Sequence, residues 1–472
     1  MGKRVCAAVL ASLLVVEPLG TAFAEQLGQA SRNVAANLAL AAQSAPGGSS
    51  SSSSVTWSGA TTITTATTTT GQTYSSTTAS QNAVLINTAS GVNVTLTNPI
   101  VTKSGGTSAG DDESFYGINS AVMCKGGGTT TITGATITTN AAGANGVFSY
   151  GGNASTNATS GDGTTVEISD STITTTGNGS GGIMTTGQGT TIASGLTVKT
   201  SGDSSAAIRS DRGGGTVTVD GGTYETSGTG SPAIYATATI GVANATLTST
   251  NSQGVVNEGG NSVTLINCIL NAGNATLGSQ DYFKNGIFLY QSMSGDASEG
   301  ASEFSMSGGT INNTVGHVFH VTNTSAAITL DDVTINNTDS ENVLISVCDD
   351  AWSGLSNVAT ITANDQTLEG DLLVGSDSTL TLDLSGTSTW TGTTSGSITS
   401  HRDSDIISSS LGTVNVTLDD DATIVLTADT TISSLSGTGY IDYNGYTLTV
   451  GSESYSSGDI GNVVDKDSSS SS

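Results

Sequence analysis

Residues 165–176 read TVEISDSTITTT, and the same pattern returns several times along the chain. Each copy has an apolar-x-apolar triplet, two or three turn residues, and then a second short strand pattern. Further copies begin at Thr216, Thr239, Ser262, Glu303 and Ala327. Self-similarity at a period of a few tens of residues is typical of stacked repeats, and short apolar–polar alternation is typical of strands. The repeat therefore predicts an all-β solenoid, a class that acts through long surfaces.

The spacing of the copies predicts how each coil is built. Val217, Ile240 and Val263 begin successive copies that are 23 residues apart. That length suits one turn of three short strands and three corners, and glycine runs such as Gly213–Gly215 supply the backbone freedom that tight corners need. We predict such coils over residues 55–450, with the most regular ones over residues 82–357.

A third strand appears when the copies are aligned. Triplets such as Ala83-Val84-Leu85 recur once per coil, with a β-branched residue at the centre. If the central residue points inward, the next one points outward, because side chains alternate along a strand. The predicted outward column consists of Leu85, Met123, Phe148, Met184, Arg209, Tyr235, Val256, Phe288, Phe319 and Leu344.

Stacked at about 4.8 Å per coil, this column would form a stripe on the order of 45 Å long. An apolar stripe of that size left in water would mark a binding surface. Other arrangements fit the same sequence. The inward and outward assignments can be reversed locally, both residues can face the core at a bend, or a long loop can cover the stripe.

Long loops collect after this strand, over residues 151–163, 291–302 and 347–357, and another precedes Ile287. In solenoids, insertions gather on one face, which is often the binding face. Their aromatic residues are candidates for stacking on sugar rings, and they can equally fold back to shield a corner. These residues are Tyr282, Phe283, Tyr290 and Trp352.

The two ends of the chain differ from the repeats. Lys3 and Arg4, an apolar run over residues 5–16 and the small-x-small site Ala22-Phe23-Ala24 predict a signal peptide over residues 1–24. Residues 25–54 read as an N-terminal segment with a Ser-rich linker, and residues 451–472 as a disordered tail. No other segment has the pattern of a membrane-spanning helix. We therefore expect an exported protein, either secreted or on the cell surface.

Charge and cysteine usage limit the kinds of partner and metal site that the sequence predicts. The chain carries a net charge of −28, so a basic footprint for nucleic acid is absent. Scattered acids could hold Ca²⁺, but no spacing matches a known calcium loop, and no cofactor is predicted. Outside the signal, Cys124, Cys268 and Cys348 are too widely spaced for a disulfide framework or zinc site, and we expect them to be buried as small apolar residues.

With this coil length and strand pattern, residues 82–357 resemble the right-handed parallel β-helix of pectate-lyase-like proteins and of passenger domains of bacterial autotransporter adhesins. The resemblance implies a right-handed parallel β-helix and a bacterial origin. This kind of fold hosts both enzymes and adhesins, so function has to be argued from sites.

The residues give little support to catalysis. Asn337-Thr338-Asp339 and Asp349-Asp350 resemble part of a polygalacturonase set, but no later Gly-His-Gly or Arg-x-Lys follows. Arg209 and Arg212, beside Asp203 and Asp211, are interpreted as solvated salt bridges.

The only two neighbouring histidines are also a weak signal. His317 and His320 are three residues apart, so they would face opposite sides of a regular strand, and a site built on them would lack its remaining ligands.

We predict a secreted or surface-exposed bacterial adhesin-like β-solenoid that binds a glycan or protein and is not an enzyme. The predicted ligand-binding residues are Phe148, Tyr235, Phe288, Phe319, Tyr282, Phe283, Tyr290 and Trp352. Two alternatives stay open: a polysaccharide lyase or hydrolase acting on acidic polysaccharide, with Asp349 or Asp350 in its site, and a structural stalk that associates with itself.

Overall fold

The computed structural model describes residues 55–106, 110–278, 280–350 and 352–466. The chain divides into two units, residues 1–51 and 52–472. The predicted signal peptide and the predicted segment 25–54 lie outside the described residues. Within the described part of the chain, no helix is both long and apolar enough to cross a membrane.

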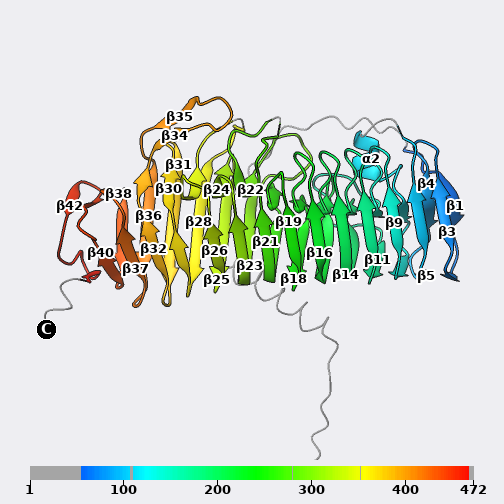
Figure 1. The fold of residues 1–472 in the computed structure, drawn as a ribbon, viewed down its shortest axis with the longest axis horizontal. Helices are drawn as coiled ribbons and strands as arrows, with labels where there is room; N and C mark the ends of the chain where they lie inside the picture. The colour runs from blue at the N-terminus through cyan, green and yellow to red at the C-terminus, as the bar shows by residue number, and fades with distance from the viewer. Residues whose placement is uncertain (1–54, 107–109, 279, 351, 467–472) are drawn as a thin grey trace, which may run out of the picture. The chain divides into compact units, whose positions relative to one another are not determined.

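Three parallel sheets run along the stacked coils, so the chain is a parallel β-solenoid with about three strands per coil (Figure 1). This confirms the predicted all-β fold class. The 13-stranded sheet, which carries the predicted third strands, contains β1 (Gly59–Ile63), β4 (Asn82–Asn87), β7 (Val122–Lys125), β10 (Val147–Tyr150), β13 (Ile183–Thr186), β15 (Ile208–Ser210), β17 (Ile234–Ala236), β20 (Val255–Glu258), β22 (Asn285–Tyr290), β24 (His317–Thr322), β27 (Val343–Val347), β30 (Asp371–Val374) and β33 (Thr394–Ser395).

The 20-stranded sheet carries the repeated sequence pattern. In some coils its two strands are separate, and in others they are one long strand. Its members are β2 (Thr67–Thr70), β3 (Thr73–Ser76), β5 (Asn93–Thr97), β6 (Ile100–Lys103), β8 (Thr129–Thr133), β9 (Thr136–Thr139), β11 (Thr165–Ser169), β12 (Thr172–Thr175), β14 (Gly189–Thr200), β16 (Gly215–Thr226), β18 (Thr239–Ala243), β19 (Thr246–Ser249), β21 (Ser262–Ala272), β23 (Ala301–Asn313), β25 (Ser325–Asp331), β26 (Thr334–Asn337), β28 (Asn357–Asn364), β31 (Ser378–Ser385), β36 (Thr413–Leu418) and β39 (Ser434–Gly437).

The core is one continuous column inside the coils. Each repeat supplies the apolar residues of its triplet and one more after the turn, as Val166, Ile168 and Ile173 do. The register between coils is strict: Val217 pairs with Ile240, and Ile240 with Val263. Cys124, Cys268 and Cys348 are buried free thiols, as predicted.

One corner has the same backbone conformation in successive coils. The residue after the first strand segment of the repeat, or at the same position within a long strand, has a positive φ between 48° and 69°. In this left-handed region Gly, Asn and Asp are tolerated and β-branched residues are strained, which explains the turn residues of the repeat. The aligned residues are Asn98, Gly134, Asp170, Gly195, Gly221, Asn244, Asn267, Gly308, Asp332, Asp365 and Gly386.

The solenoid continues further than the sequence predicts. The five-stranded sheet contains β29 (Thr367–Glu369), β32 (Thr389–Gly392), β37 (Thr423–Leu426), β40 (Tyr440–Asp442) and β43 (Val464–Asp465). A further sheet joins β38 (Thr430–Ile432), β41 (Leu448–Val450) and β42 (Glu453–Tyr455). The predicted disordered tail is therefore wrong for residues 451–466, because β42 and β43 pair with earlier strands; residues 467–472 lie outside the described part.

Candidate ligand-binding site on the 13-stranded sheet

The outward column exists on the 13-stranded sheet over most of its predicted length. Strand pairing aligns Leu85 with Met123, Met123 with Phe148 and Phe148 with Met184. The alignment continues through Arg209, Tyr235, Val256 and Phe288. The apolar members of the column pack in clusters separate from the coil interior, so they point away from the main core.

The predicted outward orientation is wrong for the last two members of the column. Phe319 pairs with Ile287, and His320 pairs with Phe288. Phe319 and Leu344 therefore point into the main core, and the outward positions belong to His320 and Ser346. Val318 and Phe319 both lie in the main core, as do Leu344 and Ile345. Simple alternation of side chains therefore fails at these two strands, and the pairing is irregular between Val343 and Ile345.

The first half of the column is covered rather than exposed. Helix α2 (Asp111–Tyr116) lies over it with Trp57, whose Nε1 donates to the Tyr116 carbonyl oxygen at 2.7 Å. The Trp57 ring also lies 5.5 Å from that of Tyr150. Phe148 is fully buried beneath this cover, so the expectation that it stands outside as a ligand-binding residue is corrected.

A second cover lies over the far end of the column. The antiparallel hairpin of β34 (Ser397–Thr399) and β35 (Ile406–Ser409) lies on the same side of the coils as α2 (Figure 1). Its Ile398 packs with Phe283 and Cys348 in a buried cluster. Phe283 is 1% exposed, so a direct role in binding at the surface is corrected for it as well. Tyr282 is half-buried and stacks under Arg402, at 4.4 Å.

Between the two covers the column is partly accessible. Arg209 and Tyr235 are the only members of the ten predicted positions that are not fully buried. Beside them lies a pocket of about 320 Å³, with an apolar and aromatic floor and a polar rim. It brings together four predicted ligand-binding residues, Tyr235, Phe288, Tyr290 and Trp352; its rim includes Asp203, Ser204, Thr229, Gln253, Gln280 and Asp281.

Ring packing and one buried carboxylate fix the aromatic floor. Phe288 stacks on Tyr290 with ring centroids 4.4 Å apart, and Tyr290 contacts Trp352 at 5.3 Å. The hydroxyls of Tyr235 and Tyr290 donate to Glu258 Oε2 at 2.5 and 3.2 Å, and Ser292 donates to its other oxygen. Burial raises the pKa of both tyrosines well above the usual value, so both stay protonated donors.

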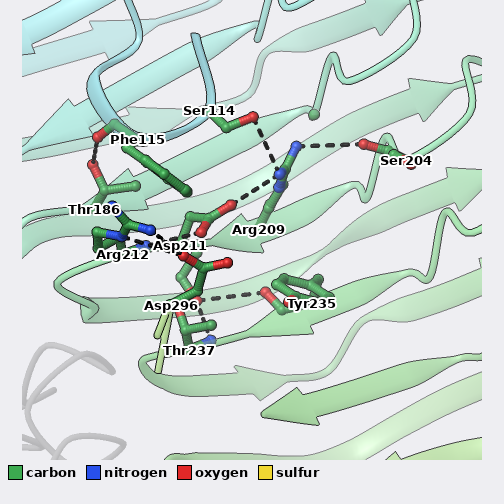
Figure 2. A network of polar contacts seen from close by, with 12 residues as sticks. Ser114, Phe115, Thr186, Ser204, Arg209, Asp211, Arg212, Tyr235, Thr237 and Asp296 are labelled. Atoms are coloured by element: carbon green, nitrogen blue, oxygen red, sulfur yellow. Dashed lines mark hydrogen bonds and ion pairs between the residues drawn. The ribbon is translucent and has the colours of Figure 1, made fainter. Parts of the chain in front are cut away.

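A polar network beside the pocket ties helix α2 and the Asp296 loop to the sheet, as Figure 2 shows. Arg209 pairs with Asp211 at 2.9 Å and reaches Ser114 of α2 at 3.4 Å. Arg212 pairs with Asp296 at 2.7 Å and lies 4.1 Å from the Phe115 ring centroid. The Arg209–Asp211 pair is buried, so the interpretation as solvated salt bridges is wrong for it.

Burial of this pair changes the pKa of the Asp211 carboxyl. Burial raises the pKa of this carboxyl to about 6, and the nearby Arg209 guanidinium only partly offsets the effect. Asp203, which the sequence grouped with these residues, lies instead on the rim of the pocket. The network therefore positions loops, and the pocket beside it remains the open site.

The aspartates that the enzyme hypothesis singles out mostly form hydrogen bonds that hold loops in position. Asp350 Oδ2 lies 3.0 Å from His320 Nε2, and its Oδ1 accepts from Thr322 Oγ1 and from the backbone nitrogen of Trp352. These bonds hold the Trp352 loop over the pocket. Asp349 is exposed, and Asp339 accepts from the backbone nitrogens of Gly316 and Glu341.

All three histidines of the chain meet near the hairpin. His317 and His320 both contact Ser346 Oγ through Nδ1, at 2.7 and 2.8 Å. The expectation that they face opposite sides is wrong, because His317 begins its strand directly after Gly316, which has a φ of 74°. His317, Glu341 and His401 offer atoms that could hold a metal ion. Local sequence spacing could not reveal this set, because His401 comes from a distant hairpin.

No protein-family model matches the chain, and no curated protein matches it significantly. The fold defines its class as a parallel β-solenoid.

Proposed function

We propose that this β-solenoid is a secreted or surface-exposed bacterial binding protein, adhesin-like and non-catalytic, which takes a sugar ring of a glycan in the pocket. The observation that carries the proposal is the meeting of Tyr235, Phe288, Tyr290 and Trp352 at the pocket between the two covers. Aromatic rings with a few convergent polar groups are typical of small-ligand sites. The leader-like N-terminal sequence supports export.

The charge of the pocket rim limits the class of glycan that can bind. Among the described residues that line the pocket, Asp203 and Asp281 are acidic and none is Lys, Arg or His. The chain as a whole is also strongly negative, at −28. Like charges repel an anionic ligand during approach. We therefore propose a neutral or amino sugar rather than an acidic polysaccharide, which also weighs against the lyase or hydrolase alternative.

Glycan-array screening followed by calorimetry tests the proposal. Trp352→Ala should weaken the binding of any glycan found at least about tenfold, because aromatic residues at the centre of a site carry much of the binding energy. Tyr446→Ala is the matched control, since Tyr446 is an aromatic residue with 38% exposure outside the pocket. Unchanged affinity in a folded Trp352→Ala protein would remove the pocket from consideration.

Two further results would replace this function with one of the alternatives. Release of reducing or unsaturated ends, lost in Asp203→Asn or Asp281→Asn, would identify an enzyme acting in the pocket. Concentration-dependent assembly without glycan binding would favour a self-associating stalk.

A further inference from the structure

Three side chains from distant parts of the chain converge beside the hairpin. His317 begins β24, Glu341 lies in the turn before β27, and His401 lies between β34 and β35. Their ligand atoms all lie within 4.8 Å of one another. His401 Nε2 is 3.0 Å and His317 Nε2 is 3.6 Å from Glu341 Oε2. Neighbouring ligand atoms around a tetrahedral zinc ion are about 3.3 Å apart, so the observed separations bracket that value.

The polar contacts around His317 share a limited number of protons. A chain of contacts runs from Asp350 through His320, Ser346 and His317 to Glu341, with lengths of 3.0, 2.8, 2.7 and 3.6 Å. Both ends are carboxylates, which only accept when ionised. With each imidazole neutral, the two rings and one hydroxyl supply three protons for these four contacts.

The longest contact is the one without a proton. Three protons satisfy the three short contacts, so His317 Nε2 turns a lone pair toward the Glu341 carboxylate. A neutral imidazole and a carboxylate are the protonation states that bind metals.

The surroundings hold the imidazoles in place. The Phe283 ring lies 5.4, 4.8 and 5.5 Å from the rings of His317, His320 and His401. Ser346 contacts the second ring nitrogen of His317. A partner on the non-ligating nitrogen is the usual way in which proteins orient a metal-binding histidine.

The hydrogen bond to His401 Nδ1 opposes metal binding, and its loss would be an observable sign that a metal ion has bound. The Lys284 backbone N–H donates to His401 Nδ1 at 2.9 Å, so the proton of a neutral His401 sits on Nε2 and faces Glu341. An ion on Nε2 requires that proton to move to Nδ1, and the Lys284 N–H then loses its acceptor. This rearrangement lowers the affinity relative to a fully prepared site.

We infer that His317, Glu341 and His401 form a binding site for a divalent transition-metal ion of the zinc type, which fastens the β34–β35 hairpin to the coils. Two imidazoles and one carboxylate suit Zn²⁺ or Co²⁺ better than Ca²⁺ or Mg²⁺. Three protein ligands leave a fourth position for water. The inference does not depend on the proposed glycan pocket.

The test is titration of the full chain, stripped with a chelator, with Zn²⁺ by calorimetry and with Co²⁺ by visible absorption. We expect one ion per chain and a higher melting temperature, since an ion that binds only the folded state stabilises it. Glu341→Gln and His401→Gln should each weaken binding at least about tenfold. Glu369→Gln, an exposed acid elsewhere, should bind as the wild type does and controls for weak binding to the acidic surface.

Two results of the titration would overturn the inference. One is the absence of stoichiometric binding of either ion. The other is equal binding by wild type, Glu341→Gln and His401→Gln. Circular dichroism of each variant checks folding. Imidazole ¹⁵N spectra provide a second readout, because the chain has three histidines: Zn²⁺ should shift His317 and move the His401 proton from Nε2 to Nδ1. Unchanged His317 and His401 signals at saturating Zn²⁺ would also contradict the inference.

Discussion

At the scale of single residues, Asp211 shows the electrostatic cost of covering the outer face of the sheet. The side chain of Asp211 is 6% exposed and pairs with Arg209, but burial still raises its pKa to about 6. The usual value in an unfolded chain is about 3.9. The folded state therefore binds a proton that the unfolded state does not, over the interval between these two values.

The sign of the pH effect follows directly. The stabilisation due to protonation of Asp211 is fully present below the unfolded pKa and is lost as pH rises through about 6. From pH 7 to pH 5, the free energy of unfolding of the wild type should rise by about 1 kcal/mol relative to that of Asp211→Asn. Chemical denaturation of both proteins across this range measures the difference, and parallel curves would contradict the prediction.

The left-handed corner gives a second prediction for a single residue. Asn244 has a φ of 55°, and its side chain donates to Asp220 at 2.8 Å. Asn244→Val should destabilise the protein by about 1–2 kcal/mol, because an L-residue with a branched side chain is strained there. Thermal unfolding measures the loss. Asn244→Gly is the control and should stay close to the wild type, since glycine adopts this conformation freely.

At the scale of elements, the β34–β35 hairpin covers the sheet mainly through the buried side chain of Ile398, with Ile407 packed beside the same cluster. Ile398 is buried against Phe283 and Cys348, whereas Ile406 of the same hairpin is 75% exposed. Burial also raises the pKa of the Cys348 thiol well above its usual value. A protonated, buried thiol is unreactive, so Cys348 reports whether the hairpin is in place.

Thiol labelling of the native protein tests the role of the hairpin. Ile398→Asp puts a charge into the apolar contact and should lift the hairpin, so that one more cysteine per chain reacts than in the wild type. Ile406→Asp should leave the number of reactive thiols unchanged, because its side chain already faces water. Equal labelling of Ile398→Asp and wild type would show that Cys348 is protected by something else.

At the scale of the whole solenoid, each coil is a nearly interchangeable layer. Val217 and Ile240 are register partners, so deletion of residues 217–239 places Ile240 where Val217 stood. Repeat proteins depend on contacts between neighbouring units. The shortened chain should therefore remain β-rich and unfold cooperatively, although it lacks Tyr235.

Removal of part of a coil provides the matched comparison. Deletion of residues 217–228 leaves the next strands without register partners and should give a protein that lacks cooperative thermal unfolding. Circular dichroism with heating compares the two deletions. Cooperative unfolding of both, or of neither, would mean that coil register does not control folding.

The solenoid can be predicted from the sequence, because each repeat specifies its own local geometry. Alternation placed Val166 and Ile168 inside, and the left-handed positions such as Asp170 set the corner. It also identified the aromatic residues that line the pocket. These features depend on a few adjacent residues and on the coil directly above or below, so they leave a periodic signal.

Tertiary structure alone decided which residues remain accessible and which distant side chains meet. Only strand pairing places Phe319 inside and His320 outside, since two adjacent apolar residues fit either register. Only the packing of α2 buries Phe148 and leaves Tyr235 at the open pocket. His317 and His401 meet because a hairpin folds back over the coils. Such loop contacts depend on shape and burial over long chain separations, and they leave no period in the sequence.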